Sequence, residues 1–407
     1  MLDSRRTRDE AAELRRLHRR AGALFGLARK RGKPRRSGRE PRSAVHVSPV
    51  LFGPDGIVGG GERAAYGFAR AVAAELPTTL VTTGPRREHL RDRDLRIEVY
   101  PTLGDLGGQR FDPLCYRFLE QLKGADVVHC HQYRVAVSQL AILAAAAASK
   151  RAFVTDLGGV GAHFDPRLPV EQCLSGLIAL SEFSLRLLPT GVPAHVIPTG
   201  VDQRFLLAGQ REPEADADDA PGESTEERVL FVGRIMRHKG IDVLIESLPS
   251  GVGLDVVGHV YDDEFYALLQ RLAVGRDVRF LHGASDEQLA DAYCSALVTV
   301  LPSVYDDAFG GHWEMPELLG CVLQESMACG TPAICSDVGG MPEVVEHRVS
   351  GYVVPPNDPV ALGRRIEELH RDRRLRLRLG RQARERALER FAWPAIARRV
   401  VSAYAGS

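Results

Sequence analysis

The stretch Pro302–Glu343 decides the fold and reads P-S-V-Y-D-D-A-F-G-G-H-W-E-M-P-E-L-L-G-C-V-L-Q-E-S-M-A-C-G-T-P-A-I-C-S-D-V-G-G-M-P-E. An apolar run before it, Leu297–Leu301, is typical of a buried parallel strand. After a loop rich in Gly and Pro, a helix is predicted from about Cys321 to Gly330, followed by a strand at Ala333–Cys335. This order predicts a doubly wound α/β unit, in which ligands bind at the carboxyl ends of the strands.

Two acidic residues lie in this unit at positions from which a carboxylate can reach a ligand. Glu317 lies in the loop before the helix, and Glu325 lies about one turn inside the helix. One carboxylate can face the reacting end of a ligand while the other accepts hydrogen bonds from hydroxyls further along it. The alternative is that both are solvent-facing helix acids and that Glu317 only favours the positive end of the helix dipole.

The residues around these acids carry a longer motif. Glu317 and Glu325 are separated by seven residues, and the strings M-A-C-G-T-P and D-V-G-G-M-P-E follow. This pattern resembles the large retaining glycosyltransferase family 4, also called glycosyl transferases group 1. The resemblance implies the GT-B fold, an α/β fold of two Rossmann-like doubly wound domains with an interdomain cleft. The sequence departs from the family at Leu319, where an aromatic residue is usual, and in the long loop Tyr305–Pro316.

The composition of the 407 residues, 44% hydrophobic and 26% charged, is ordinary for a globular protein and allows two domains. The net charge is zero, but residues 1–42 hold 15 Lys and Arg against five Asp and Glu. The seven cysteines have no paired or metal-ligand spacing, which favours a reducing cytosol. No run in the sequence reaches the roughly 18 apolar residues of a membrane span. No secretory signal is recognisable either, so the expected location is the cytoplasm, with membrane association left open.

The chain is predicted to have five parts. An acidic stretch with Pro, Gly and Ser separates two runs of alternating strands and helices. The family resemblance gives the first domain to the acceptor and the second to the nucleotide-sugar. The parts are a basic N-terminal extension (1–42), an N-terminal Rossmann-like acceptor domain (43–207), an acidic linker (208–227), a C-terminal Rossmann-like nucleotide-sugar domain (228–390) and a C-terminal helix (391–407) that crosses back to the first domain.

The N-terminal extension contains a candidate amphipathic helix. A basic helix of this kind can contact an anionic membrane surface. The alternative is a solvated or disordered tail. The apolar residues that recur at helical spacing among its arginines are Leu14, Leu17, Ala21, Leu24, Phe25 and Ala28.

The acceptor domain begins with a predicted core strand, Ala44–Phe52, and a glycine-rich stretch, Gly59–Arg63, that opens a helix. Glycines at a helix N-terminus let the backbone approach a phosphate closely. The stretch lacks the Lys-Ser/Thr of a P-loop and the spacing of the dinucleotide fingerprint. In the family a G-G-x-E stretch here faces the donor diphosphate, which the resemblance assigns to Gly60, Gly61 and Glu62.

Further strands follow at regular spacing with helices between several of them, as in a parallel sheet with crossover helices. They are predicted at Thr79–Thr83, Arg96–Tyr100, Asp126–His131, Ala152–Thr155, Gly176–Leu180 and Ala194–Ile197.

The acceptor side of the site is the least defined. The string D-V-V-H-C-H, which ends at His131, resembles a strand end of the family, and this His is expected to point into the cleft. The alternative is a strand-end His bonded to the backbone. Many relatives carry a His two positions after Thr155, where this chain has Leu157. Asp156 and His163 are the candidates to occupy the vacated space.

The nucleotide-sugar domain begins with a strand at Val229–Val232 and the string Gly233-Arg-Ile-Met-Arg-His-Lys-Gly240. The family has Gly-Arg, four residues and Lys-Gly here, so Arg234 and Lys239 are expected to bind the donor diphosphate. Two fixed cations stabilise the negative charge on the departing diphosphate. Ordinary surface charge is the alternative. The resemblance thus implies a catalytic set of Glu317, Arg234 and Lys239, and further donor contacts at Leu281, Gly320, Cys321, Val322 and Glu325.

The resulting prediction is a retaining, metal-independent hexosyltransferase that moves a sugar from a nucleotide-sugar to an acceptor hydroxyl. Glu317 is expected to contact the transferred sugar and Glu325 the ribose. No cofactor and no nucleic-acid partner is expected, and a UDP-sugar is favoured over a GDP- or ADP-sugar. The string D-A-D at 216–218 lies in the linker, away from a suitable metal loop. The alternatives are a non-catalytic nucleotide-sugar-binding module and a GT-B epimerase or phosphorylase.

Overall fold

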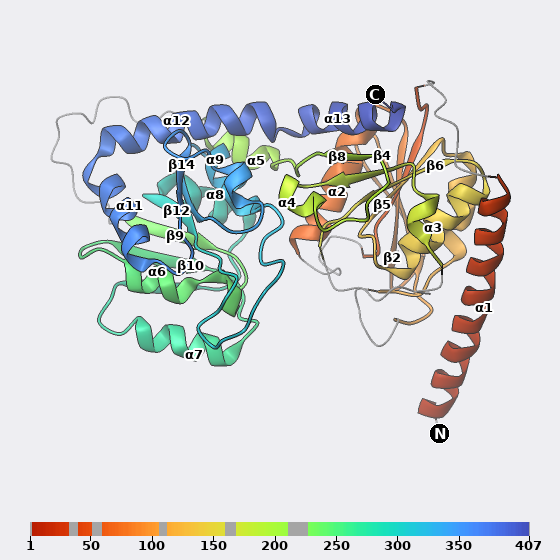
Figure 1. The fold of residues 1–407 in the computed structure, drawn as a ribbon, viewed down its shortest axis with the longest axis horizontal. Coiled ribbons are helices and arrows are strands. Elements are labelled where there is room, and N and C mark those ends of the chain that lie inside the picture. The colour runs from red at the N-terminus through yellow and green to blue at the C-terminus, as the bar shows by residue number, and fades with distance from the viewer. Residues whose placement is uncertain are drawn as a thin grey trace. The chain divides into compact units, whose positions relative to one another are not determined.

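The computed structural model contains two compact units (Figure 1). Unit 1 comprises residues 1–180, 185–200 and 393–407, and unit 2 comprises residues 181–184 and 201–392. The structure describes residues 2–31, 40–50, 59–105, 112–158, 168–210 and 227–406, with side chains from residue 15 onward. Residues 211–226 of the predicted linker lie outside the described residues.

Unit 1 is built on an 8-stranded sheet with the order β3-β4-β2-β1-β5-β6-β7-β8. Its neighbouring strands are parallel, except for the antiparallel edge pair β3 and β4. The chain leaves β1 toward β2 on one side and later returns to β5 on the other, so a topological switch point lies between β1 and β5. The strands are β1 (Ala44–Val47), β2 (Thr78–Gly84), β3 (Glu88–Asp92), β4 (Leu95–Pro101), β5 (Val127–His131), β6 (Arg151–Thr155), β7 (Gly176–Ala179) and β8 (Ala194–Val196).

The helices of unit 1 bury apolar faces that repeat at helical spacing. Phe68, Ala69 and Val72 of α2 are fully buried, as the 3.6-residue period predicts. Helix α4 spans the boundary between the two units. The helical elements are α1 (Leu2–Arg31), α2 (Gly60–Ala73), α3 (Ala136–Ala147), α4 (Glu182–Leu185), α13 (Trp393–Ala405) and the 3₁₀ turns η2 (Arg117–Gly124) and η3 (Val170–Cys173).

Helix α1 corrects the expectation of a solvated N-terminal tail. Leu17, Ala21 and Ala28 are buried in the core of unit 1, where α1 lies beside α3 (Figure 1). The reason is that α3 is apolar on nearly all sides and offers a complementary surface. The apolar face that we expected to reach a membrane is therefore used in packing, and its membrane contact stays a prediction.

Unit 2 is built on a 6-stranded parallel sheet with the order β11-β10-β9-β12-β13-β14. Its switch point lies between β9 and β12. The strands are β9 (Arg228–Val232), β10 (Gly253–Val257), β11 (Val278–Leu281), β12 (Val298–Leu301), β13 (Ala333–Ser336) and β14 (Gly351–Val354). The helical elements are α5 (Gln203–Ala208), η4 (Arg237–Lys239), α6 (Ile241–Ser247), α7 (Asp263–Leu272), α8 (Asp286–Ser295), α9 (Cys321–Ala328), α10 (Met341–Val344), α11 (Pro359–Arg371) and α12 (Arg373–Arg390).

Two strands differ from the sequence-based expectation. The predicted strand Ala44–Phe52 is shorter, because β1 ends at Val47 and residues 51–58 lie outside the described residues. Strand β3 was not predicted, since its sequence E-H-L-R-D has no apolar alternation. A charged edge strand of this kind is common, because charges protect an open sheet edge from pairing with other chains. Among the helices of the described residues, none has the length and apolar character needed to cross a membrane.

Candidate functional site

The two predicted donor motifs of unit 2 meet at the switch point of its sheet. The loop with Arg234 and Lys239 follows β9, and the loop with Glu317 follows β12. Because β9 and β12 are neighbours and parallel, both loops leave the sheet at the same carboxyl edge. Sequence motifs nearly eighty residues apart (78 between Lys239 and Glu317) are thereby brought together.

Lys239 and Glu317 form an ion pair in which Nζ donates to Oε1. The two side chains are 10% and 12% exposed, so the pair is shielded from most solvent screening. Ser303 Oγ donates to the same Oε1 over 3.0 Å. Glu317 Oε2 makes no hydrogen bond within the described residues, and Lys239 Nζ has three protons to donate. The pair can therefore bind an anion through Lys239 and a hydroxyl through Glu317.

Two glycines of the motifs allow these loops to approach each other. Gly240 adopts a φ of 63°, and a Cβ at this residue would lie 2.1 Å from the Pro302 carbonyl oxygen. A Cβ on Gly339 would lie 2.0 Å from the carbonyl oxygen of Glu317. A side chain at either position would push apart the backbones that hold Lys239 and Glu317. The K-G and V-G-G strings are thus explained by backbone packing.

The other predicted donor residues of unit 2 lie at the carboxyl ends of β9 and β11 and at the start of α9. Arg234 is exposed, lies 5.7 Å from the Tyr261 ring centroid and makes no ion pair within the described residues. Leu281, the last residue of β11, is 42% exposed. Gly320 is the N-cap of α9, and Cys321 and Val322 are its first residues, so they lie at the positive end of the helix dipole, which favours an anion or a hydroxyl.

Glu325 is partly committed to the protein. Its Oε2 accepts a hydrogen bond of 2.9 Å from the hydroxyl of the fully buried Tyr293. Burial, together with the charge of Glu325, raises the pKa of Tyr293 well above its usual value, so the phenol stays a donor. This contact holds the Glu325 carboxylate in one orientation.

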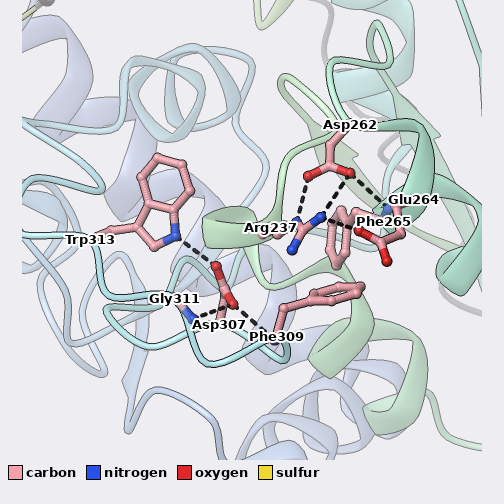
Figure 2. Close-up of polar contacts among 8 residues, drawn as sticks. All are labelled: Arg237, Asp262, Glu264, Phe265, Asp307, Phe309, Gly311 and Trp313. Atoms are coloured by element: carbon pink, nitrogen blue, oxygen red, sulfur yellow. Dashed lines mark hydrogen bonds and ion pairs between the residues drawn. The ribbon is translucent and has the colours of Figure 1, made fainter.

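The long loop Tyr305–Pro316 is a braced structure (Figure 2). Asp307 accepts hydrogen bonds from the N–H groups of Phe309 and Gly311, both at 2.9 Å, and from Trp313 Nε1 at 2.8 Å. Burial acts to raise the pKa of Asp307, but these hydrogen bonds outweigh it and hold the pKa below its usual value. The loop is therefore organised around one carboxylate.

The same loop is attached to the loop that carries Lys239. Arg237 lies over the Phe309 ring at 3.9 Å and donates hydrogen bonds of 2.6 Å to Asp262 and to Glu264 (Figure 2). The next residue, His238, packs against Trp313 with ring centroids 4.5 Å apart. Neither these contacts nor the role of Ser303 follows from a motif, so the sequence alone did not predict them.

In unit 1 the predicted phosphate loop also lies at a switch point. Gly60 and Gly61 are the first residues of α2, which follows β1. A Cβ on Gly61 would lie 3.6 Å from Gln132 Nε2 and 3.7 Å from the Leu157 Cβ. Gln132 follows the last residue of β5 and has a backbone φ of 69°, a value that residues other than glycine rarely adopt. The start of α2 therefore faces Gln132 and Leu157.

His131 does not reach solvent in this structure, because its side chain is 0% exposed and its ring stacks on Phe68. A hydrogen bond of 3.0 Å joins its Nε2 to His46 Nδ1. The expectation of a His that points into the cleft is therefore replaced by a buried one. Burial lowers the pKa of His131 to about 3, so the ring is neutral.

His46 and His131 belong to a chain of buried hydrogen bonds. Tyr404 Oη from α13 bonds His46 Nε2 at 3.1 Å and His129 Nδ1 at 2.6 Å, and His129 Nε2 bonds Thr155 Oγ1 at 2.7 Å. The three histidines bring ligand nitrogens within 4.8 Å of one another, which a metal site also requires. The hydrogen bonds already use five of the six ring nitrogens. We therefore interpret the three histidines as part of this buried hydrogen-bond network and not as a metal site. The remaining nitrogen, His131 Nδ1, has no partner among the described residues.

Of the two other acceptor-side candidates, Asp156 and His163, the structure describes only Asp156. Asp156 is half-buried, and burial raises its pKa although the N–H groups of Gly158 and Tyr133 donate to its carboxylate. The Asp156 carboxylate thus already accepts hydrogen bonds from the backbone of neighbouring residues. His163 lies outside the described residues.

Solved structures with a similar fold show which fold class this two-unit architecture belongs to. Sucrose-phosphate synthase from Thermosynechococcus elongatus is similar with a TM-score of 0.63 and 23% identity, over 89% of this chain and 98% of that one. Anabaena HepE in complex with UDP and glucose is similar with a TM-score of 0.63 and 17% identity, over 90% of this chain and 100% of that one. The two Rossmann-like units therefore define a GT-B fold.

The family follows from the sequence matches. Residues 58–205 match the model of Glycosyltransferase Family 4, and residues 214–386 match the model of Glycosyl transferases group 1. Together the two matches span most of the chain, and the motifs with Lys239 and Glu317 lie inside the second. The chain therefore belongs to glycosyltransferase family 4, whose second domain is described by the group 1 model.

Curated relatives match over a part of their length. An uncharacterised glycosyltransferase of Methanocaldococcus jannaschii is 32% identical over 44% of this chain and 45% of its own length. A D-inositol 3-phosphate glycosyltransferase of Streptomyces bingchenggensis is 33% identical over 43% of this chain and 40% of its own length. The chain thus spans less than half the length of each of these two relatives.

Proposed function

We propose that this protein is a retaining hexosyltransferase that moves a sugar from a nucleotide-sugar to an acceptor hydroxyl. The observation that carries the proposal is the shielded Lys239–Glu317 pair at the switch point of unit 2, with the exposed cation Arg234 on the same loop as Lys239. A cation, a carboxylate and a helix N-terminus together suit a diphosphate joined to a polyhydroxyl group.

The proposed chemistry depends on charge stabilisation. As the bond from the sugar to the diphosphate breaks, negative charge grows on the leaving oxygen. Lys239 supplies a point charge and Arg234 a planar fork of donors, so both stabilise that charge. Since these side chains provide the positive charge, we propose that turnover does not require a metal ion.

Glu317 is proposed to hold the transferred sugar through its unused Oε2, and Glu325 the ribose. Retention of configuration requires the acceptor hydroxyl to attack the face of the sugar from which the diphosphate leaves. Positioning both groups on that face supplies a large part of the rate enhancement, because bound reactants no longer have to find each other.

The identity of the donor is proposed from the relatives. HepE was solved with UDP and glucose, and other relatives are named for transfer to D-inositol 3-phosphate. A UDP-hexose is therefore the first donor to test, ahead of GDP- and ADP-sugars, and D-inositol 3-phosphate is the first acceptor.

The test is thermal stabilisation of the purified full chain by UDP-, GDP- and ADP-sugars and by the free diphosphates, followed by product analysis. Binding to the folded state raises stability with the logarithm of ligand concentration over Kd. We expect one base to shift the melting temperature of the wild type but not of Lys239→Ala, and we expect an α-linked product from an α-linked donor in the presence of EDTA. Free epimer or sugar phosphate as the product would assign one of the alternative enzymes, and binding without turnover would assign a binding module.

A further inference from the structure

Gln132 has a strained backbone that its neighbours hold in place. Its φ of 69° lies in the left-handed region, which is costly for a residue with a side chain and is found preferentially at functional sites. Its N–H donates to the Thr155 carbonyl over 2.9 Å. The preceding residue, His131, is fixed by its bond to His46, and Thr155 is fixed by His129. These hydrogen bonds therefore hold the backbone of Gln132 in this conformation.

That side chain lies beside the start of α2. Its Nε2 is 3.6 Å from the place where a Cβ on Gly61 would be, and the Leu157 Cβ is 3.7 Å from the same place. The amide is half-buried and makes no hydrogen bond to another described residue. It is thus a polar group available to a ligand at the switch point of unit 1.

The neighbouring candidates are less suitable for that task. The Leu157 side chain is apolar and offers no hydrogen bond. The Asp156 carboxylate already accepts from the backbone of Gly158 and Tyr133, and His131 is fully buried. Among the described residues near Gly61, Gln132 is therefore the one that combines partial exposure with an unused donor and acceptor.

We propose that Gln132 is a specificity-determining residue that binds a sugar hydroxyl of the substrate beside Leu157 and the start of α2. An amide suits a hydroxyl because it can donate and accept at once and carries no charge. The inference rests on the proposed function and names a substrate contact made by unit 1.

The test compares Gln132→Gly and Gln132→Asn with the wild type. Gly removes the amide and relieves the backbone strain, whereas Asn keeps an amide and tolerates a positive φ. We expect Gln132→Gly to lower kcat/KM for UDP release from UDP-glucose by about tenfold to a hundredfold. We expect its melting temperature to stay equal or rise, because glycine is favoured at this φ. Gln132→Asn is expected to lie between the two in activity.

Arg93→Gly is the matched control, because Arg93 also has a positive φ, 53°, but lies in an exposed turn between β3 and β4. It should gain stability without a change in kcat/KM. Weaker binding of UDP-glucose relative to UDP in Gln132→Gly assigns the hydroxyl to the transferred sugar. Unchanged donor binding with slower transfer to D-inositol 3-phosphate assigns it to the acceptor.

Three results overturn the inference, and each has a different cause. If the wild type turns over a nucleotide-sugar and Gln132→Gly has the same kcat/KM with and without the acceptor, the inference fails and the proposed function stands. If the wild type neither binds nor turns over any nucleotide-sugar of the panel, the proposed function fails and the inference fails with it. A loss of activity that parallels a fall in melting temperature would assign Gln132 a structural role only.

Discussion

Lys239 and Glu317 form an ion pair although 78 positions separate them in the chain. Each follows one of two neighbouring parallel strands, so the sheet fixes the distance between them. Ser303, the second residue after β12, adds a hydrogen bond to the same carboxylate oxygen. The geometry of the pair is therefore set by the fold, and a substrate does not have to assemble it.

Removal of Lys239 tests this pair directly. Lys239→Ala removes a cation from the site and leaves the shielded Glu317 without its counter-charge. We expect kcat/KM to fall by about 10²–10³, as for loss of one preorganised donor, and stability to fall by about 1–3 kcal/mol. Steady-state kinetics and urea unfolding measure both. In the double mutant Lys239→Ala/Glu317→Gln, part of the lost stability should return, because no unpaired charge remains. A double mutant less stable than Lys239→Ala would contradict the coupling.

The Tyr404 hydroxyl is predicted to stabilise unit 1 from the C-terminal helix. Tyr404→Phe leaves His46 Nε2 and His129 Nδ1 buried without partners. Each unsatisfied buried group costs about 1–3 kcal/mol, so the variant should unfold at a clearly lower urea concentration. Tyr266→Phe is the control, because its hydroxyl makes one long contact of 3.4 Å to His282 and should change stability little. Equal urea midpoints for the two variants would show that the buried hydrogen bonds of Tyr404 contribute nothing to stability.

Acidification is predicted to destabilise unit 1. Burial lowers the pKa of His46, His129 and His131, the last to about 3, whereas an unfolded His titrates near 6.5. Below pH 6.5 the unfolded chain therefore binds more protons, so stability is complete above that pH and declines as the pH falls toward the folded-state pKa values. At pH 5 the loss is about 2 kcal/mol for each buried histidine.

The two tryptophans allow this loss to be assigned to a unit, because Trp393 lies in unit 1 and Trp313 in unit 2. In Trp313→Phe, the remaining fluorescence reports on unit 1 alone. Its urea midpoint should fall between pH 7.5 and pH 5. His259→Gln, a change at an exposed His of unit 2, should leave that pH dependence unaltered. A midpoint that is constant over this range would contradict the burial of neutral histidines.

Asp307 is predicted to hold the loop Tyr305–Pro316 in place. Asp307→Ala removes the acceptor for two backbone N–H groups and for Trp313 Nε1 (Figure 2). We expect hydrogen exchange in the loop to rise by at least about tenfold, and KM for the donor to rise because Trp313 no longer braces His238 beside Lys239. Asp306→Ala is the matched control, since the Asp306 carboxylate is exposed and, within the described residues, forms an ion pair only with the exposed His312. Equal exchange in both variants would assign the order of the loop to other contacts.

The sequence predicted the strands and loops whose formation depends on residues close together in the chain. Apolar runs located the buried strands, and the resemblance of two strings to motifs of the family located the loops of Lys239 and Glu317. His129 and His131 alternate on one strand, so a shared face was also predictable. Their partners were not, because His46 is brought opposite His129 only by strand pairing, and Tyr404 only by packing of the last helix.

The same limit applies to the loop and to Gln132. The string Y-D-D-A-F-G-G-H-W-E-M-P has no periodicity, and its brace depends on Arg237 and His238 from another loop. The left-handed conformation of Gln132 is imposed by neighbours and contradicts the usual preference of Gln. Residues whose role comes from such tertiary contacts carry no motif that a single sequence reveals.

Helix α1 gives the last prediction, because two of its leucines have opposite surroundings. Leu17 is 1% exposed in the core that α1 shares with α3, whereas Leu27 is 49% exposed. Leu17→Ala should cost about 2–4 kcal/mol through lost burial and the cavity that remains. Leu27→Ala should cost less than about 0.5 kcal/mol.

Urea unfolding of both variants in the Trp313→Phe background, where fluorescence reports on unit 1, measures the difference. The same two variants also test the membrane contact predicted for residues 1–42, by sedimentation with anionic vesicles. If the folded helix binds lipid through its exposed arginines, both variants should pellet equally and release at high salt, because exposed charges are screened by added ions. Equal stability of Leu17→Ala and Leu27→Ala would mean that α1 does not pack on α3, and pelleting reduced only in Leu17→Ala would mean that its apolar face turns to the lipid.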